Sequence, residues 1–328
     1  MKFTSLVTGG AGFLGSHMVD FLLKKKHKVI VVDDLSTGIK ENLSHNLNNK
    51  NFFFIKKNIQ NFKLSDLKNK KIDYIFHFAG RAAIVPSIVN PSLYFNTNVF
   101  GTLNLLENFR KLKIKKFVYA ASSSCYGNAK VPTNENNTIS LLHPYAASKY
   151  YGEQLCMHWN NVYKMPINSI RIFNAYGTRV SFNQGYGAAF SIFLKQKLEK
   201  KPLTIVGNGK QKRDFIFATD LAKAFYLSAK SKYSGEIYNL GTGKPTSVNK
   251  IAKLIGGKKI NIPRRPGEPN ITQANINKIK KHLRWKPKVS ISNGTASMIK
   301  NINFWKKGKL WTKSTIMKET KEWFKILS

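Results

Sequence analysis

The stretch Thr8-Gly9-Gly10-Ala11-Gly12-Phe13-Leu14-Gly15 follows the apolar run 3–7 and precedes an apolar pattern of helical period over 17–23. This order predicts a strand, a tight turn and a helix. Gly9, Gly12 and Gly15 let the backbone turn sharply, let a pyrophosphate approach the amides and let the helix pack closely on the strand. Because a helix N-terminus attracts anions, the stretch indicates a dinucleotide-binding turn rather than a purely structural one.

An acidic residue ends the second expected strand, 28–32. Asp33 lies close to the spacing of about 20 residues expected for a carboxylate that accepts hydrogen bonds from an adenosine ribose. Asp33 and Asp34 would repel a 2′-phosphate, and no arginine follows closely. The sequence therefore predicts NAD rather than NADP as the cofactor.

The length of 328 residues suits a nucleotide-binding domain with a second lobe. The first strand is expected at residue 3, which leaves no room for a signal peptide, and no apolar run reaches the length of about 20 residues that a membrane span needs. The two cysteines, Cys125 and Cys156, form neither a disulfide framework nor a metal cluster. We expect a cytoplasmic protein with no metal site and no membrane partner.

The formal net charge of +39 is typical of nucleic-acid-binding proteins. However, the lysines are spread along the whole chain, together with a general excess of Asn, Ile and Phe. This distribution indicates a compositional bias rather than one binding surface. We expect no nucleic-acid partner, although the charge attracts anionic nucleotides.

Strands that alternate with helical patterns predict an α/β fold, namely a doubly wound parallel sheet of the Rossmann type. Its further strands are expected at 52–57, 74–78, 116–120, 167–173 and 236–240. Ligands of such sheets lie beyond the carboxyl ends of the strands. The pattern becomes irregular after residue 175, which predicts a smaller mixed α/β substrate domain. We expect a dinucleotide-binding domain over 1–175 with a return segment at about 215–245, and a substrate domain over 176–214 and 246–328.

A tyrosine and a lysine lie four residues apart at the start of a helix expected near Pro144. Tyr145 and Lys149 would share one helical face, about 6 Å apart along the axis. A tyrosine with its ordinary pKa of about 10 needs roughly 4 kcal/mol of phenolate stabilisation to act as a base near pH 7. An ammonium and a cationic nicotinamide supply that in a partly buried site. A surface aromatic residue beside a solvated lysine is the alternative interpretation.

These residues resemble the extended short-chain dehydrogenase/reductase family, and within it the nucleotide-sugar epimerases of the UDP-glucose 4-epimerase type. The resemblance runs from about residue 2 to about residue 285. It rests on motifs in this order: the glycine stretch at 8–15, Asp33 to Gly38, Ser122 to Gly127, Tyr145-xxx-Lys149, Arg171-Ile-Phe-Asn174, Arg213-Asp-Phe and Arg265-Pro-Gly-Glu268. It implies a homodimer in which helices at about 92–110 and 145–163 pair across a twofold axis.

The resemblance implies that Tyr145 removes the proton of the sugar 4-hydroxyl while carbon 4 gives hydride to NAD. Lys149 would bind the nicotinamide ribose and lower the pKa of Tyr145, and Ser122 would relay the proton. The 4-keto sugar would turn about its diphosphate link and take the hydride back on its other face. The cofactor is then regenerated in every turnover.

The resemblance also assigns binding residues. Asn174, Arg213 and Arg265 would grip the diphosphate, and Glu268 would bind the nucleotide ribose. The expected cofactor contacts are Gly9, Gly12, Phe13, Leu14, Gly15, Asp33, Asn58, Ile59, Phe78, Ala79, Gly80, Asn98, Tyr145, Lys149 and Phe173. The expected substrate contacts are Ser122, Ser123, Ser124, Asn174, Ala189, Phe190, Thr204, Val206, Arg213, Arg265, Glu268 and Thr272. If Arg213 were merely structural, it would be a surface ion-pair partner of Asp214.

Four positions depart from the family pattern. Asn58 replaces the usual Asp against adenine, although its amide oxygen still accepts a hydrogen bond. Gly80 replaces a common Ala, and Thr178 a common Pro. Thr272 stands where a bulky Tyr restricts related enzymes to plain hexoses, so its smaller side chain indicates room for an N-acetyl group.

Three alternatives remain at this point. A 4,6-dehydratase needs an acid and a base for its elimination step, where this chain has Ser122, Ser123 and Ser124. A UDP-glucuronate decarboxylase is harder to exclude, because it needs only oxidation and loss of carbon dioxide, and a UDP-glucuronate epimerase belongs to the same alternative. A non-catalytic NAD-binding scaffold is disfavoured by the complete set of Ser122, Tyr145 and Lys149. We expect an NAD-dependent enzyme that inverts carbon 4 of a UDP-hexose.

Overall fold

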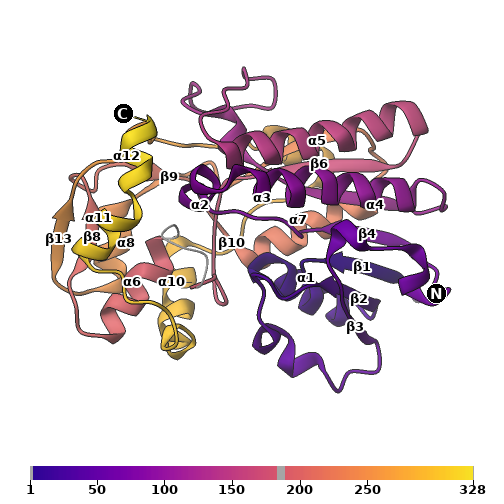
Figure 1. Ribbon diagram of the computed structural model, residues 1–328, viewed down its shortest axis with the longest axis horizontal. Helices are drawn as coiled ribbons and strands as arrows, with labels where there is room; N and C mark the ends of the chain where they lie inside the picture. The colour runs from indigo at the N-terminus through magenta and orange to yellow at the C-terminus, as the bar shows by residue number, and fades with distance from the viewer. Residues whose placement is uncertain (1–2, 183–188, 328) are drawn as a thin grey trace.

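The computed structural model describes residues 3–182 and 189–327, and its larger lobe is built on a seven-stranded sheet (Figure 1). The strand order is β11-β6-β5-β4-β1-β2-β3, and every neighbouring pair is parallel. The strands are β1 (Thr4–Thr8), β2 (Lys28–Asp33), β3 (Phe52–Lys56), β4 (Tyr74–His77), β5 (Lys116–Ser122), β6 (Ile167–Ile172) and β11 (Glu236–Leu240). The order reverses between β1 and β4, so a crevice opens at the carboxyl ends of these strands.

Helices cover both faces of the sheet, which confirms the doubly wound fold. Side chains from α1 (Phe13–Lys24) and α7 (Ala218–Lys230) form one hydrophobic cluster with the sheet. Side chains from α4 (Gly101–Phe109) and α5 (Pro144–Tyr163) form the cluster on the other face. The central strands β5 and β6 are buried throughout, as is typical of a parallel sheet with two covered faces. Shorter elements of this lobe are η1 (Lys40–Asn46), η2 (Ile59–Asn61), η3 (Leu64–Leu67), α2 (Ile84–Val89), η5 (Ser123–Tyr126) and α9 (Asn277–Leu283).

The helical segment expected over 91–110 contains a π turn. It consists of α3 (Pro91–Phe95), the π turn η4 (Asn96–Phe100) and α4. The turn places Asn98 where its Oδ1 accepts from the Arg81 amide at 2.8 Å and its Nδ2 donates to the Arg81 carbonyl at 3.0 Å. The same Nδ2 donates to Ser148 Oγ at 2.9 Å. Asn98 therefore ties the turn that follows β4 to helix α5.

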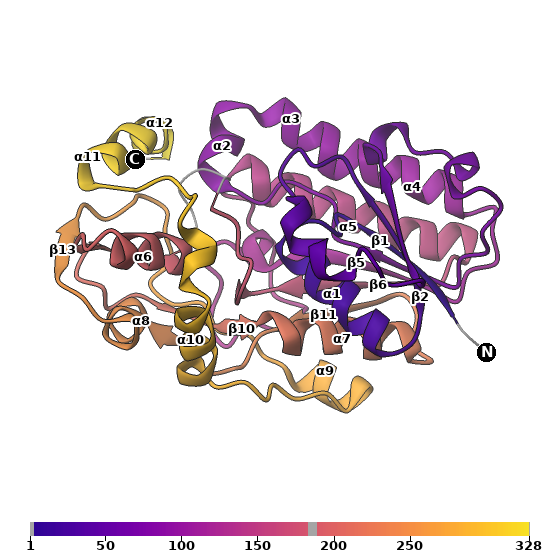
Figure 2. The ribbon, with the colours of Figure 1, turned by 90° about the horizontal axis from the view of Figure 1, so that it is seen from below.

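The smaller lobe has a mixed α/β architecture, as expected, and lies beside the carboxyl ends of the sheet (Figure 2). Three two-stranded pairs are found there or at its junction with the sheet: β8 (Leu203–Val206) with β13 (Lys259–Ile262), β9 (Lys212–Arg213) with β12 (Thr246–Ser247), and β7 (Asn174–Tyr176) with β10 (Phe215–Phe217). Its helices are α6 (Ala189–Leu198), α8 (Val248–Ile255), α10 (Ile291–Lys300), η6 (Ile302–Trp305), α11 (Lys313–Glu319) and α12 (Lys321–Leu327).

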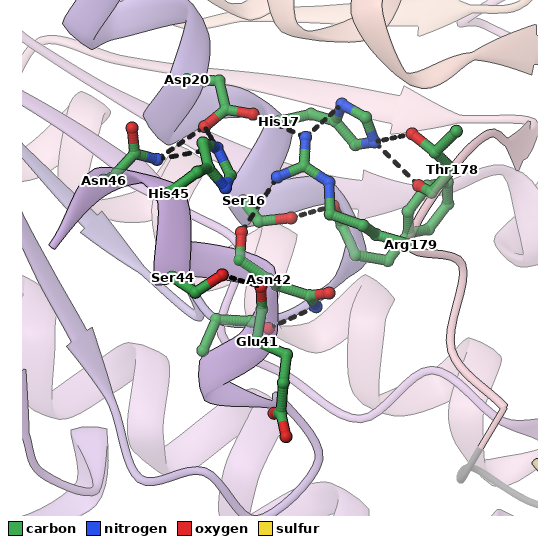
Figure 3. A network of polar contacts seen from close by, with 12 residues as sticks. Ser16, His17, Asp20, Glu41, Asn42, Ser44, His45, Asn46, Thr178 and Arg179 are labelled. Atoms are coloured by element: carbon green, nitrogen blue, oxygen red, sulfur yellow. Dashed lines mark hydrogen bonds and ion pairs between the residues drawn. The ribbon is translucent and has the colours of Figure 1, made fainter. Parts of the chain in front are cut away.

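A polar network fixes the segment through which the chain leaves the sheet for the smaller lobe (Figure 3). Arg179 donates from Nη2 to Asp20 Oδ2 at 2.6 Å and to His17 Nδ1 at 3.0 Å, and from Nη1 to the Asn42 carbonyl at 3.1 Å. Because Nδ1 of His17 accepts, its Nε2 carries the hydrogen and donates to the Thr178 carbonyl at 2.8 Å. The network holds this segment against α1 and η1.

His17 makes the stability of this junction depend on pH. Burial, aided by the charge of Arg179, lowers the pKa of His17 from 6.5 to about 4, while Asp20 opposes the shift and His45 adds slightly to it. Between these pH values the unfolded chain binds a proton that the folded chain does not, so stability is lost as the pH falls. We expect the free energy of unfolding to drop by about 2 kcal/mol more between pH 7 and pH 5 than it does in His17→Gln. Urea unfolding of both proteins at the two pH values measures this, and identical pH dependences would contradict it.

Candidate active site

The crevice between the lobes is a cleft of about 580 Å³. It brings together the glycine turn, the carboxyl ends of the strands and the loops of the smaller lobe. Every residue expected to contact the substrate lines it, as do the expected cofactor contacts with one exception. The exception is Asn98, which is fully buried behind the wall and positions the turn at Gly80 and Arg81.

The glycine turn forms a cradle that side chains would fill. Gly9 has φ +68°, and a Cβ there would lie 2.6 Å from the Ala79 nitrogen. A Cβ at Gly15 would overlap the Gly9 carbonyl. Gly12 is the N-cap of α1 and has no side chain that could accept hydrogen bonds from the first turn. The amides of that turn therefore stay available to a phosphate. These features fit the diphosphate of a dinucleotide.

Acidic and amide groups line the expected adenosine end. Asp33 accepts from the Ala11 amide at 2.9 Å and from the Leu35 amide at 2.8 Å, which fixes the turn, and each oxygen keeps a lone pair for a ribose hydroxyl. Burial raises the pKa of Asp33, against the effect of these amides. Asn58 donates to Asp34 Oδ2 at 3.0 Å, and its Oδ1 accepts from the Gln60 amide at 2.8 Å. The oxygen expected to face adenine thus already caps η2.

Tyr145 and Ser122 meet at the centre of the cleft, and Lys149 lines the same cleft. Tyr145 donates from Oη to Ser122 Oγ at 3.1 Å, and Ser122 donates to Ser124 Oγ at 3.1 Å. The Lys149 ammonium lies 4.3 Å from the centroid of the Tyr119 ring. Tyr145 and Lys149 come from one face of α5, and Ser122 ends β5. The arrangement provides a hydroxyl chain along which a proton can move.

Burial perturbs both ionisable groups of this centre. It raises the pKa of Tyr145, because a buried phenolate is poorly solvated, and the hydrogen bond with Ser122 opposes the rise. This direction is opposite to the one expected for a base. Burial lowers the pKa of Lys149 to about 8. Its ammonium contacts the face of Tyr119 rather than the Tyr145 hydroxyl.

A buried ion pair joins strand β6 to helix α5, which carries Tyr145 and Lys149. Arg171 on β6 donates from Nη2 to Glu153 Oε1 at 2.6 Å and from Nε to both carboxylate oxygens at 3.1 Å. Only 4% of the Arg171 side chain and 1% of the Glu153 side chain are exposed. Burial lowers the pKa of Arg171, but its bonds with Glu153 outweigh this effect, so the net shift of the pKa is upward. The pair fixes α5, the helix of Tyr145, to the sheet.

The far end of the cleft carries positive charge. Arg213 donates to Glu268 Oε1 at 2.8 Å, and Arg265 Nη1 lies 4.0 Å from the same oxygen. Arg213 is not paired with Asp214, whose buried carboxylate instead accepts from the amides of 242, 243 and 274. Thr272 donates to Asn174 Oδ1 at 3.2 Å. The guanidinium groups suit a diphosphate.

Comparison with known proteins shows the family to which this chain belongs. Residues 6–298 match the profile of the family described as GDP-mannose 4,6 dehydratase. The chain belongs to this family of short-chain dehydrogenase/reductases. An uncharacterized UDP-glucose epimerase of Bacillus subtilis is 38% identical over 309 residues, which span 90% of this chain and 96% of that protein.

Two solved structures resemble this short-chain dehydrogenase/reductase over nearly their full length. UDP-N-acetylglucosamine 4-epimerase of Methanobrevibacter ruminantium, in complex with UDP-N-acetylmuramic acid, has a TM-score of 0.85 and 31% identity, covering 92% of this chain and 100% of that one. UDP-glucuronic acid 4-epimerase of Bacillus cereus, in complex with UDP-glucuronic acid and NAD, has a TM-score of 0.86 and 32% identity, covering 92% and 99%. The expected epimerase family is thereby confirmed.

Arg81 and Trp323 are among several wall residues of this short-chain dehydrogenase/reductase that were not anticipated from its sequence. Arg81 lines the cleft, and its buried Nε has no hydrogen-bond partner among the described residues. Arg81 directly follows Gly80, which was the last residue of the turn after β4 that was expected to contact the cofactor. Trp323 also lines the cleft, from the C-terminal helix α12. No family motif points to Trp323 as a site residue, because the resemblance to the family ends at about residue 285.

The structure describes residues 3–182 and 189–327. Within them, no group of three or more His, Cys, Asp or Glu side chains could hold a metal ion. No described helix is both long enough and apolar enough to cross a membrane.

Proposed function

We propose that this protein is an NAD-dependent epimerase that inverts carbon 4 of a UDP-hexose. The decisive observation is the contact of 3.1 Å between Tyr145 Oη and Ser122 Oγ, with Lys149 one turn along the same helix. This centre lies in one cleft between a dinucleotide cradle and an arginine-rich end. Relatives at more than 30% identity are named as UDP-sugar 4-epimerases.

The side chains perform distinct tasks in this reaction. When bound, NAD accepts a hydride from carbon 4 and returns it to the opposite face of that carbon. Tyr145 takes the proton of the 4-hydroxyl and later gives it back, and Ser122 holds that hydroxyl within reach. Lys149 binds the nicotinamide ribose. Arg213 and Arg265 retain the diphosphate while the 4-keto sugar turns between them and the base.

The raised pKa of Tyr145 fits this sequence of events. Burial keeps the phenol protonated until positive charge enters the cleft beside it. The cationic ring of the oxidised cofactor, when bound, would supply this charge. Tyr145 therefore becomes a base only in the loaded enzyme.

The positions of the acidic side chains disfavour a 4,6-dehydratase, despite the name of the family profile. The acidic residues among the described lining residues are Asp33, Asp34 and Glu268. The first two flank the glycine turn, and Glu268 lies between the arginines. None is beside Tyr145, where elimination across carbons 5 and 6 would need an acid and a base.

The direct test omits added cofactor. Purified protein is incubated with UDP-N-acetylglucosamine or with UDP-glucose, and the sugar protons are followed by NMR. We expect each active substrate to interconvert with its 4-epimer, because the cofactor is retained and regenerated. If neither substrate changes while denatured protein releases NAD, the assignment to these sugars is wrong, and UDP-glucuronate is tried next.

Thr272 is proposed to admit the N-acetyl group. Its hydroxyl contacts Asn174 on the cleft wall, where a tyrosine would occupy the space. We expect Thr272→Tyr to lower kcat/KM for UDP-N-acetylglucosamine by about 10- to 200-fold, with a much smaller change for UDP-glucose. Thr272→Ser is the matched control and keeps the hydroxyl. An equal loss on both sugars would show that the position does not select the substituent.

We also propose the division into domains at 1–175 with 215–245, and 176–214 with 246–328, although α9 (Asn277–Leu283) packs on the larger lobe. The separate hydrophobic cluster of the smaller lobe supports it. A homodimer is supported by the large apolar side chains exposed on α2, α3, η4 and α5, namely Val89, Leu93, Phe100, Tyr151, Val162 and Tyr163. A cytoplasmic location is supported by two free, buried cysteines.

A further inference from the structure

The last two helices lie outside the part of the chain that matches the family profile. The family profile ends at residue 298, whereas α11 and α12 begin at Lys313 and Lys321. The segment is fixed to the smaller lobe first. Trp305 donates to the Val180 carbonyl at 3.0 Å, and Ile316 is buried in the hydrophobic cluster of that lobe.

From this attachment the chain crosses toward the larger lobe. Helix α12 packs against α2, which follows the cleft wall at Gly80 to Ala83. Figure 2 shows the yellow α11 and α12 above the smaller lobe, with α2 on the adjacent side of the larger lobe. The tail thus bridges the two lobes beside the cleft.

One side chain of α12 enters the cleft. Trp323 is 5% exposed, and its indole nitrogen donates to the Pro266 carbonyl at 3.0 Å. The guanidinium carbon of Arg265 lies 5.5 Å from the centroid of its ring. Trp323 therefore contacts both the backbone and the cation of the loop that carries Glu268.

We propose that Trp323 is a positioning residue that holds Arg265 in place for the diphosphate of the nucleotide sugar, so that the tail completes the substrate site. This inference rests on the proposed function. Arg265 is a long side chain on a loop, and Trp323 and Glu268 both contact it, so loss of the indole would lower its rotamer order before binding. A guanidinium placed in advance binds phosphate more tightly, because less entropy is lost on association.

The expected effect falls on binding rather than on the chemical step. Trp323→Leu should weaken UDP binding about tenfold in calorimetry, by loss of the stacked cation. It should raise KM for the UDP-sugar by a similar factor, with kcat and NAD content close to wild type. Ile326→Ala, an exposed side chain on the same helix, is the control and should bind UDP as wild type does.

A double-mutant cycle separates positioning from general structural support. If Trp323 acts through Arg265, Trp323→Leu should weaken UDP binding much less in an Arg265→Met background than in the wild type. Equal losses in both backgrounds would overturn the proposal. Trp323→Phe, which conserves a ring, should abolish the UDP-dependent change in tryptophan emission. An unchanged signal would overturn the proposal even if Trp323→Leu failed to fold.

The outcomes also distinguish this inference from the proposed function. If the wild type binds UDP and Trp323→Leu binds it within about twofold, the inference is wrong and the proposed function stands. If the wild type does not bind UDP, the UDP-sugar assignment fails and the inference fails with it.

Discussion

Tyr145→Phe is expected to lower kcat roughly 1,000-fold, because it removes the group that accepts and returns the proton of the sugar hydroxyl. The ring stays in place, and the only described hydrogen bond that is lost is the one to Ser122. Bound NAD and the free energy of unfolding should therefore stay close to wild type. The rate is measured by NMR on the interconverting sugar protons.

A second tyrosine provides the matched control. The Tyr94 ring lies 6.5 Å from the Tyr145 ring, and its hydroxyl bonds to the Ala83 backbone instead of to Ser122. We expect Tyr94→Phe to retain most of the activity. If Tyr145→Phe kept more than about a tenth of the wild-type rate, general-base catalysis by Tyr145 would be refuted.

The largest expected effect on stability comes from the ion pair beneath the active site. Glu153→Leu leaves the Arg171 guanidinium charged and buried, and among the residues that the structure describes it then bonds only to Tyr126 and the Glu135 carbonyl. We expect a loss of about 3–5 kcal/mol in the free energy of unfolding, measured with urea. Arg171→Met should cost a similar amount, since it strands the carboxylate.

The double variant Glu153→Leu/Arg171→Met tests the physical reason. If the cost arises from an unpaired buried charge, removing both charges should recover most of the stability lost in either single variant. Additive losses would instead indicate that packing or the bonds to Ser169 and Tyr126 dominate. In either case, the activity of the double variant shows whether catalysis requires this ion pair to fix α5 to the sheet.

Much of the larger lobe was predictable from local pattern. Apolar runs ending in polar or small residues predicted all seven strands of the sheet within two residues at each end. The strand predictions succeed because strand burial is a local consequence of residue type. The glycine turn and Asp33, the last residue of β2, predict where a dinucleotide binds, and that position stays a prediction.

The remaining features depend on contacts between distant segments. The partner of Arg213 is Glu268, far along the chain, rather than the adjacent Asp214. The pKa of Tyr145 follows the burial of the whole cleft, which no short motif records. Trp323 reaches the site only because α12 packs on α2. Such placements are decided by the assembled lobes and not by spacing.

The π turn at Asn96 to Phe100 has a consequence for how the length of this chain can vary. A π turn accommodates one residue more than a regular helix does. Deleting a residue there would give a more regular helix, yet it would pull Asn98 away from Arg81 and Ser148, which its amide joins. We therefore expect a one-residue deletion in this helix to displace the wall of the cleft, whereas the same change in a surface loop would leave the wall in place.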